Sequence, residues 1–253
     1  MNTPSPQPLQ YLSFGAFAAV MGLSGLSLAW ARAQPFMGAA AGIIAWVIGV
    51  AALLLFALLG GLSLLRWQRH PLAVLEDLRH PVRQSFAAAV PASVILLATV
   101  VTMLAGPSVL ARTIWGLGAA SQLAMTVWLL SRWLWTPGRG GFQWAGITPV
   151  LFIAVVGNVL VPLAGVPLGM AEWSAAQLGV GLLWWPVVLT LLVVRIGQHG
   201  LWPERLLPAT FIALSPPAVI GVALLQMGAP PSVAWAMWGM GLFFLAWSAS
   251  VFK

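Results

Sequence analysis

Residues 38–65 read GAAAGIIAWVIGVAALLLFALLGGLSLL, a run of 28 residues without a charged side chain. A helix needs about 20 apolar residues to cross a bilayer, so this run is long enough to span one. The rest of the chain is similar, since 61% of its 253 residues are hydrophobic and 6% are charged. Soluble domains are roughly a quarter charged. The composition therefore predicts an all-α integral membrane protein with the lipid bilayer as its main partner, and nearly excludes a soluble catalytic or ligand-binding module.

Apolar runs separated by helix breakers predict eight membrane-spanning helices, at 11–31, 38–65, 84–105, 111–134, 147–166, 173–195, 206–228 and 232–252. Consecutive spans pair into four helical hairpins, at about 11–65, 84–134, 147–195 and 206–252. These hairpins make up a single transmembrane domain over residues 1–253.

Basic residues concentrate in alternate loops, nine on one side against two on the other. Because basic loops stay in the cytoplasm, we expect both termini there and the protein in the cell's inner (plasma) membrane. The net charge of +7 thus reflects bilayer orientation and does not indicate a nucleic-acid partner. The nine are Arg66, Arg69, Arg79, Arg83, Arg132, Arg139, Arg195, Arg205 and Lys253, and the two are Arg32 and Arg112.

The four connections on the opposite side are short and alike. Each is a proline- and glycine-containing turn, which predicts that the two helices it joins are antiparallel neighbours. The recurrence of such turns indicates a repeat of hairpins. The turns are residues 34–38, 106–108, 165–169 and 228–232.

The two helices of each predicted hairpin differ in their content of helix-distorting residues. The first helices of the second, third and fourth hairpins carry prolines, and that of the first hairpin has glycines instead. The prolines are Pro91, Pro149, Pro162, Pro216 and Pro217, and the glycines are Gly15, Gly22 and Gly25. Kinked membrane helices are tolerated where protein or a water-filled cavity satisfies the freed carbonyls, so we expect the first helices to be inner and the second helices to face lipid. The alternative is the general abundance of proline and glycine in membrane helices. Tryptophans expected to face lipid are Trp46, Trp115, Trp128, Trp133, Trp184, Trp185, Trp235, Trp238 and Trp247.

No charged residue or histidine lies near the middle of a predicted span, which argues against a proton relay, a voltage sensor or haem ligation. The pair Glu76 and Asp77 lies in a charged loop and is better explained as a solvated face than as a catalytic dyad. The chain has no cysteine, so disulfides and thiolate metal sites are excluded. We expect no enzymatic activity, cofactor or metal site.

The weakly polar and kink-forming residues of the inner helices are candidates for lining a pore, although hydroxyl groups in membranes also serve to join helices. The candidates are Gly15, Gly22, Ser24, Pro91, Ser93, Asn158, Pro162, Ser215 and Pro216. At the predicted cytoplasmic mouth, Arg79, His80 and Arg83 would favour anions through their field. Anchoring of the helix at the membrane surface is an equal explanation for these three residues.

Several stretches resemble the tellurite-resistance/dicarboxylate transporter (TehA-like) family, which includes plant guard-cell slow anion channels and the yeast malate permease. The resemblance extends over essentially the whole chain. It rests on GLSGLSLAW at 22–30, HPVRQSF at 80–86 leading to Pro91, Trp115–Gly116 to Gln122, Thr148 through Asn158 to Pro162, and Leu206 to Pro216–Pro217.

The resemblance implies five hairpins around a central pore with the odd helices inside, usually in a homotrimer with one pore per protomer. The sequence matches eight of the ten helices, so we expect the fifth hairpin, with its gating phenylalanine, to be absent. No residue is therefore assigned to that role. Phenylalanines on inner helices are candidates for occluding the pore, with packing or lipid contact as the alternative. They are Phe14, Phe86, Phe152 and Phe211.

The functional prediction is a membrane anion channel or carrier that moves small anions or C4-dicarboxylates, with tellurite or sulfite efflux among the candidates. The alternative is a shortened, non-conducting family member that acts as a structural or oligomerising membrane protein. Four inner helices close a pore of the family's kind only if they pack more tightly or if a partner supplies the fifth.

Overall fold

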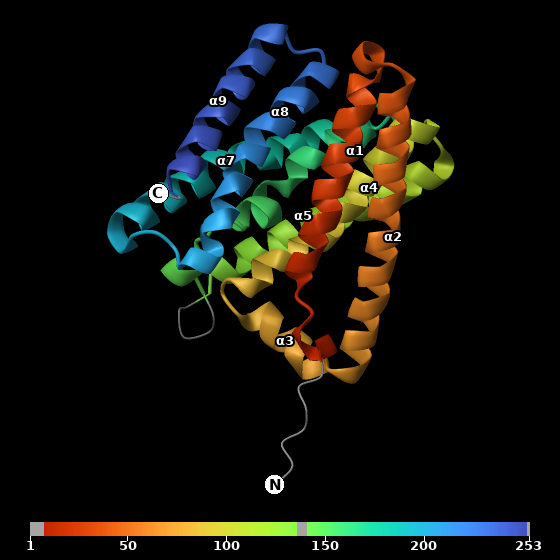
Figure 1. Ribbon diagram of the computed structural model, residues 1–253. Coiled ribbons are helices and arrows are strands. Elements are labelled where there is room, and N and C mark those ends of the chain that lie inside the picture. Colours follow the sequence, from red (N-terminus) through yellow and green to blue (C-terminus); the bar gives the residue numbers. More distant parts are fainter. Residues whose placement is uncertain (1–7, 136–140, 252–253) are drawn as a thin grey trace.

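The computed structural model describes residues 8–135 and 141–251, which fold almost entirely into helices (Figure 1). Arg139 and Lys253, two of the nine basic residues on the predicted cytoplasmic side, lie outside the described residues. Within the described ranges, seven helices are long and apolar enough to cross a membrane. The predicted all-α membrane fold is confirmed. Seven of the eight predicted spans are helices of membrane length, and the remaining one, at 147–166, contains a shorter apolar helical segment, Phe152–Gly165.

The first hairpin consists of α1 (Phe17–Met37) and α2 (Ala39–Arg69). The expected turn at 34–38 is shorter than predicted, because α1 continues through Pro35. Proline fits the helical φ and costs a single backbone hydrogen bond, so it does not by itself end a helix. Gly38 ends it: its φ of 76° is in the left-handed region that favours glycine, and its N–H donates to the carbonyl of Gln34 at 2.9 Å.

The second hairpin is preceded by a short helix, α3 (Pro71–Arg79), and a 3₁₀ turn, η3 (Arg83–Ala88). Its membrane helices are α4 (Ala89–Ala105) and α5 (Val109–Trp133). The hydroxyl of Ser108 caps α5 by accepting the N–H of Ala111 at 3.1 Å. The side chain thus satisfies one of the donors that a helix start leaves free.

The fifth predicted span is not a continuous helix, and residues 147–166 are called the broken segment below. It contains a π-helical turn (Phe152–Val156), a 3₁₀ turn (Gly157–Leu160) and the one-turn helix α6 (Pro162–Gly165). Prolines 149 and 162 each remove a backbone donor, and Gly157 between them weakens the helix further. Such irregular backbone is tolerated at membrane depth where protein surrounds it, and the segment is almost entirely buried.

The remaining helices are α7 (Ala171–His199), the 3₁₀ helix η8 (Glu204–Leu214), α8 (Ser215–Gln226) and α9 (Pro231–Ser250). Left-handed glycines occupy both turns of this half, Gly169 with a φ of 76° and Gly228 with a φ of 88°. The recurring proline- and glycine-containing turns therefore end helices through their glycines.

Small residues allow the helices of the first half to approach closely. Ala45, Gly49 and Ala52 form a buried stripe on α2. The hydroxyl of Ser27 on α1 donates to the carbonyl of Ala45 at 2.7 Å. A Cβ atom on Gly49 would lie 2.9 Å from Val100 Cγ1 on α4. Because lipid is as apolar as the helices, such packing and hydrogen bonding hold α1, α2 and α4 together.

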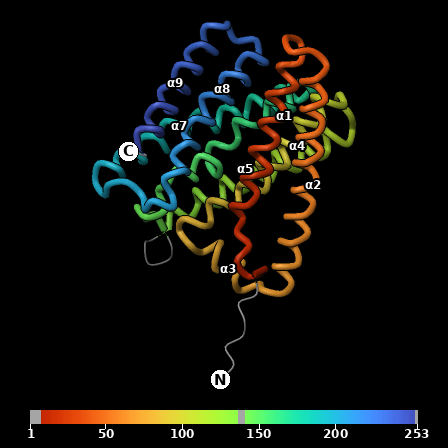
Figure 2. The backbone as a smooth tube through the Cα atoms, viewed as in Figure 1, coloured from red at the N-terminus to blue at the C-terminus, as the bar shows by residue number. Residues whose placement is uncertain are grey.

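Figures 1 and 2 show α1 with α2 on one side of the molecule, α8 with α9 on the other, and the broken segment, drawn in green, between the two pairs. In the span that includes α4, 67% of the most apolar stretch is buried, whereas in α9 the buried share is 17%. Helix α4 is therefore an inner helix and α9 an outer one. The shares for α1 and α2, 22% and 28%, do not separate an inner from an outer helix. One flank of α1 is therefore left uncovered by the described residues.

Candidate functional site

A cavity of about 420 Å³ lies between the inner elements and is called the central cavity below. Helices α1 and α4, the broken segment, η8 and α8 all contribute to its wall. The lining residues are Ala18, Met21, Gly22, Gly25, Leu96, Phe152, Ile153, Val156, Gly157, Val159, Leu160, Ile212, Ser215, Pro216 and Val219.

The wall of the central cavity is apolar and uncharged. Among the described residues that line it, Ser215 alone has a polar side chain, and none is ionisable. Gly22 and Gly25 leave open space on the α1 side, because a Cβ atom on either would meet nothing within 4 Å. The cavity therefore offers room without a fixed charge.

The central cavity is bounded by α1 on one side and by α8 on another, and these two helices have different neighbours. Helix α1 packs against α2 and α4, whereas α8 packs against α9 and the 3₁₀ turn Gly157–Leu160. Within the described chain, α1 and α8 do not pack extensively against each other. The ring of inner elements is thus open between α1 and α8.

A second hollow, of about 780 Å³, lies between α8 and α9 and is called the α8–α9 groove. Its wall includes Pro217, Gly221, Trp235, Trp238 and Leu242. The two tryptophans are 68% and 58% exposed, as expected for side chains that meet lipid. This apolar surface suits lipid or another helix and carries no chemistry of its own.

Of the predicted pore-lining residues, Gly22, Ser215 and Pro216 lie on the central cavity. The other candidates are placed elsewhere. Ser93 joins two helices, with its hydroxyl 2.7 Å from the carbonyl of Ala89 and 3.2 Å from that of Phe17. The candidates that do not line the cavity are Gly15, Ser24, Pro91, Ser93, Asn158 and Pro162.

Asn158 is turned away from the central cavity toward α5. Its side-chain amide donates to the hydroxyl of Thr126 at 2.8 Å and lies 3.3 Å from the carbonyl of Val155. Ser24 is fully buried on α1. Pro91 is buried on α4, and Pro162 is buried at the start of α6. The polar side chain of Asn158 suggested that it lines the pore, but the irregular backbone of the broken segment turns it toward α5.

Of the four candidate occluding phenylalanines, Phe152 reaches the central cavity. Phe86 packs beside Gly15, where a Cβ atom would lie 3.2 Å from its ring. Phe14 lines a separate hollow with Phe17, and Phe211 lies on η8 with 37% of its surface exposed. The structure therefore brings one of these rings to the cavity and distributes the other three around it.

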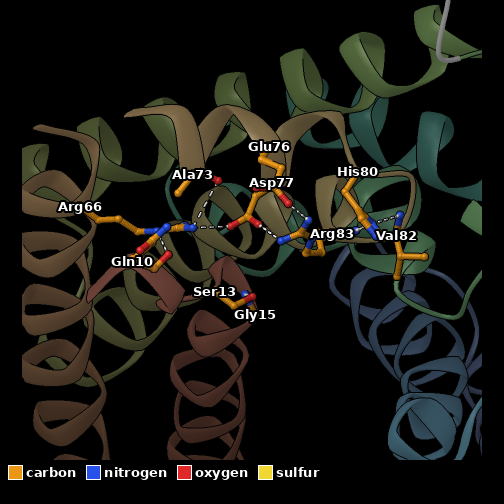
Figure 3. Close-up of polar contacts among 10 residues, drawn as sticks. All are labelled: Gln10, Ser13, Gly15, Arg66, Ala73, Glu76, Asp77, His80, Val82 and Arg83. Carbon is orange, nitrogen blue, oxygen red and sulfur yellow. Dashed lines mark hydrogen bonds and ion pairs between the residues drawn. The ribbon is translucent and has the colours of Figure 1, made fainter. Parts of the chain in front are cut away.

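Two of the three predicted mouth residues, Arg83 and His80, belong to a network of polar contacts around α3 and η3 (Figure 3). Arg83 lies 2.7 Å from the carboxylates of both Asp77 and Glu76. Asp77 also pairs with Arg66 at 2.8 Å, and Arg66 and Asp77 are 4% and 5% exposed. Two arginines thus face two carboxylates, which reduces the field that Arg83 was expected to supply. The remaining candidate on α3, Arg79, is exposed.

His80 has a local structural contact in this network. Its Nδ1 accepts the backbone N–H groups of Val82 at 3.2 Å and of Arg83 at 3.3 Å, which requires a neutral ring nitrogen. Burial, followed by the charge of Arg83, lowers the pKa of His80 below its usual value of 6.5. The hydrogen bond from Arg83 is the main cause that lowers the pKa of Glu76. These shifts favour the carboxylate form of Glu76 and the neutral form of His80.

Sequence reasoning did not single out the polar face of α5. Gln122 and Thr126, four residues apart in an apolar span, donate to carbonyls of the broken segment. Residues four apart lie on the same face of a helix, so this spacing is the feature of the sequence that could have identified the polar face. Trp115 was expected to face lipid, and this is wrong: it is 3% exposed, and its Nε1 donates to the carbonyl of Val161 at 2.9 Å. A buried indole needs such a partner, which the broken segment provides.

Comparison with known proteins agrees with this architecture. An uncharacterized transporter of Methanocaldococcus jannaschii is 24% identical over 224 residues, which cover 83% of this chain and 64% of the relative. The chain thus spans less than two thirds of that relative's length. The profile of the voltage-dependent anion channel family SLAC1 matches residues 11–253. Since this match covers nearly the whole chain, the protein belongs to the voltage-dependent anion channel (SLAC1) family.

Proposed function

We propose that the protein is an anion channel or carrier that moves small anions or C4-dicarboxylates through the central cavity. The observation that carries this proposal is an uncharged cavity walled by distorted inner elements in a chain of the anion channel family. No carboxylate is among the described residues that line the cavity, so no fixed negative charge opposes an anion there. A cation would find no ring of acidic groups to replace its hydration shell.

We also propose that the basic end of the bundle faces the cytoplasm of a cell with the protein in its inner membrane. Arg66 and Arg83 meet at Asp77 at this end, and Arg132 donates to the carbonyl of Leu78 on the neighbouring α3 at 2.7 Å. Their clustering supports the orientation expected from basic loops. We expect a homo-oligomer, a trimer by family resemblance.

Anion flux from liposomes that contain the purified chain tests the proposal. Chloride, nitrate, sulfate, malate and tellurite are the probes, and efflux of at least one of them should exceed that from empty liposomes. Potassium flux measured in parallel tests selectivity, and a preference for potassium would overturn the proposal.

A matched pair of tryptophan substitutions tests whether anions pass through the central cavity. Gly22→Trp projects an indole into the open space on α1, whereas Gly179→Trp adds the same side chain on α7 at a glycine with no neighbour within 4 Å. Gly22→Trp should reduce anion flux strongly, and Gly179→Trp should leave it unchanged. Equal inhibition by both variants would show that the flux does not pass through the cavity.

The second candidate is a non-conducting, oligomerising family member. The opening between α1 and α8 favours it, because a pore must be closed on all sides to exclude lipid. Under this alternative, the folded oligomer in liposomes passes none of the five probes. Flux sensitive to Gly22→Trp would exclude it.

A further inference from the structure

The distortion of the broken segment frees backbone carbonyls inside the bundle. A regular helix pairs each carbonyl with an N–H four residues on, and the π-helical and 3₁₀ turns of residues 152–160 interrupt this pattern. A freed carbonyl in a membrane protein needs another donor or becomes costly. The carbonyls of Ile153 and Ala154 find theirs on α5.

The donors on α5 are two side chains one helical turn apart. The amide of Gln122 donates to the carbonyl of Ile153 at 3.0 Å and lies 3.3 Å from that of Ala154. The hydroxyl of Thr126 lies 2.8 Å from the carbonyl of Ala154 and 2.9 Å from that of Gln122 in its own helix, so these two acceptors share its single hydrogen. Its oxygen accepts the amide of Asn158. Gln122, Thr126 and Asn158 are at most 1% exposed. These hydrogen bonds are therefore shielded from water, and hydrogen bonds are stronger in the protein interior than in water.

Gly157 fixes how closely the amide of Gln122 approaches the broken segment. A Cβ atom at Gly157 would lie 2.6 Å from Gln122 Nε2, closer than real Cβ contacts. The glycine thus allows the amide to rest directly on the backbone. Gln122 packs on the backbone at Gly157 and donates toward the carbonyls of Ile153 and Ala154. Both packing and hydrogen bonding therefore set its orientation.

The same segment also lines the central cavity, through Phe152, Ile153, Val156, Gly157, Val159 and Leu160. Ile153 thus lines the cavity while its carbonyl accepts from Gln122 on α5. Carbonyl oxygens carry partial negative charge, and rings of them select cations in channels. Carbonyls held on the α5 side do not contribute such charge to the cavity.

We propose that Gln122 and Thr126 are positioning residues for charge selectivity: they hold the carbonyls of Ile153 and Ala154 away from the central cavity and so keep the pathway favourable to anions. This inference rests on the proposed function. Loss of either donor frees carbonyls of a segment that already departs from helical geometry, and these then turn toward the cavity.

The first test measures the chloride-to-potassium permeability ratio from reversal potentials in a potassium chloride gradient. Gln122→Met and Thr126→Val remove one donor each while nearly preserving volume, and each should lower the ratio by about fivefold, the factor expected from one hydrogen bond. Thr126→Ser keeps the hydroxyl and should restore the ratio. An unchanged ratio in folded Gln122→Met and Thr126→Val would overturn the proposal.

Gln177→Leu is the matched control. The amide of Gln177, also buried, donates to the carbonyl of Ala119 at 3.2 Å, so it joins α7 to regular helix in α5 rather than to the broken segment. This variant should change stability without changing the permeability ratio. A fall equal to that of Gln122→Met would indicate a general packing effect and refute the specific role.

The second test does not depend on conduction. The chain has no cysteine, so Gly22→Cys places a single thiol on the cavity wall in open space. Methanethiosulfonate reagents carrying a sulfonate or a trimethylammonium group then report the local potential through their relative rates. Adding Thr126→Val should lower the sulfonate-to-ammonium rate ratio by about fivefold. An unchanged ratio refutes the inference even if the protein does not conduct, while absent flux with a changed ratio refutes only the proposed function.

Discussion

Asp77→Asn is expected to destabilise the protein strongly, although it replaces only one carboxylate oxygen by an amide nitrogen. The Asp77 carboxylate lies 2.8 Å from Arg66 and 2.7 Å from Arg83, and it is 5% exposed. Arg66, 4% exposed, also donates to the carbonyl of Gln10 at 3.1 Å and so ties the N-terminal segment to α2 and α3. The substitution preserves shape but leaves the Arg66 guanidinium buried beside a neutral group.

The expected magnitude follows from the burial of the pair. Removing one partner of a buried ion pair costs about 3–5 kcal/mol, which corresponds to a fall of about 6–20 °C in unfolding temperature for a chain of this size. Glu76→Gln removes the other carboxylate that contacts Arg83, but the side chain of Glu76 is 71% exposed. Water replaces that interaction, so Glu76→Gln should leave the unfolding temperature nearly unchanged.

Thermal unfolding in detergent, followed by the fluorescence of the 15 tryptophans, measures both variants. A much larger fall for Asp77→Asn than for Glu76→Gln is expected. If both variants shift the unfolding temperature equally, burial does not set the strength of this network, and the reasoning fails.

Three further predictions concern pH and packing. The lowered pKa of His80 means that its neutral form stabilises the fold above pH 6.5 and that this contribution is lost as pH falls through the lowered value. His80→Asn keeps an acceptor that does not titrate, so it should flatten the dependence of unfolding temperature on pH in this range. Gly181→Ala should cost about 1–3 kcal/mol by overpacking, because its Cβ would crowd Val159, whereas Gly197→Ala on the same helix should stabilise by about 0.5–1 kcal/mol. A stabilised Gly181→Ala would contradict the close packing of α7 on the broken segment. Trp115→Phe should cost about 1 kcal/mol or more through the lost hydrogen bond to Val161, measured as a lower unfolding temperature, and no change would mean that this bond is not formed.

The positions of the long spans could be predicted because bilayer thickness imposes a length and a composition on every spanning helix. Helices α2, α4, α5 and α9 agree with the predicted spans to within a few residues. The broken segment could not be predicted in the same way. Its composition satisfies the requirement for a span, but Pro149, Gly157 and Pro162 act together to change its backbone geometry.

The candidate site was predicted in part, for a related reason. Gly22, Ser215 and Pro216 lie on the central cavity because they sit on the inner face of elements close to regular helix. Asn158 was a candidate because of its polar side chain, but it lies on irregular backbone that turns this side chain toward α5. The paired state of Arg83 was equally hidden, since its partners are fixed by how α3 folds back against η3.

The sequence by itself determined that this chain is a helical membrane protein built from hairpins and that its predicted spans carry no buried charge near their middle. These properties depend on composition and on local rules for turns, which act over a few residues. The tertiary structure decided which residues line the cavity, which carbonyls are satisfied by Gln122 and Thr126, and that the inner ring is open between α1 and α8. Those properties depend on contacts between segments distant in sequence, and the rotation of each element about its own axis sets them.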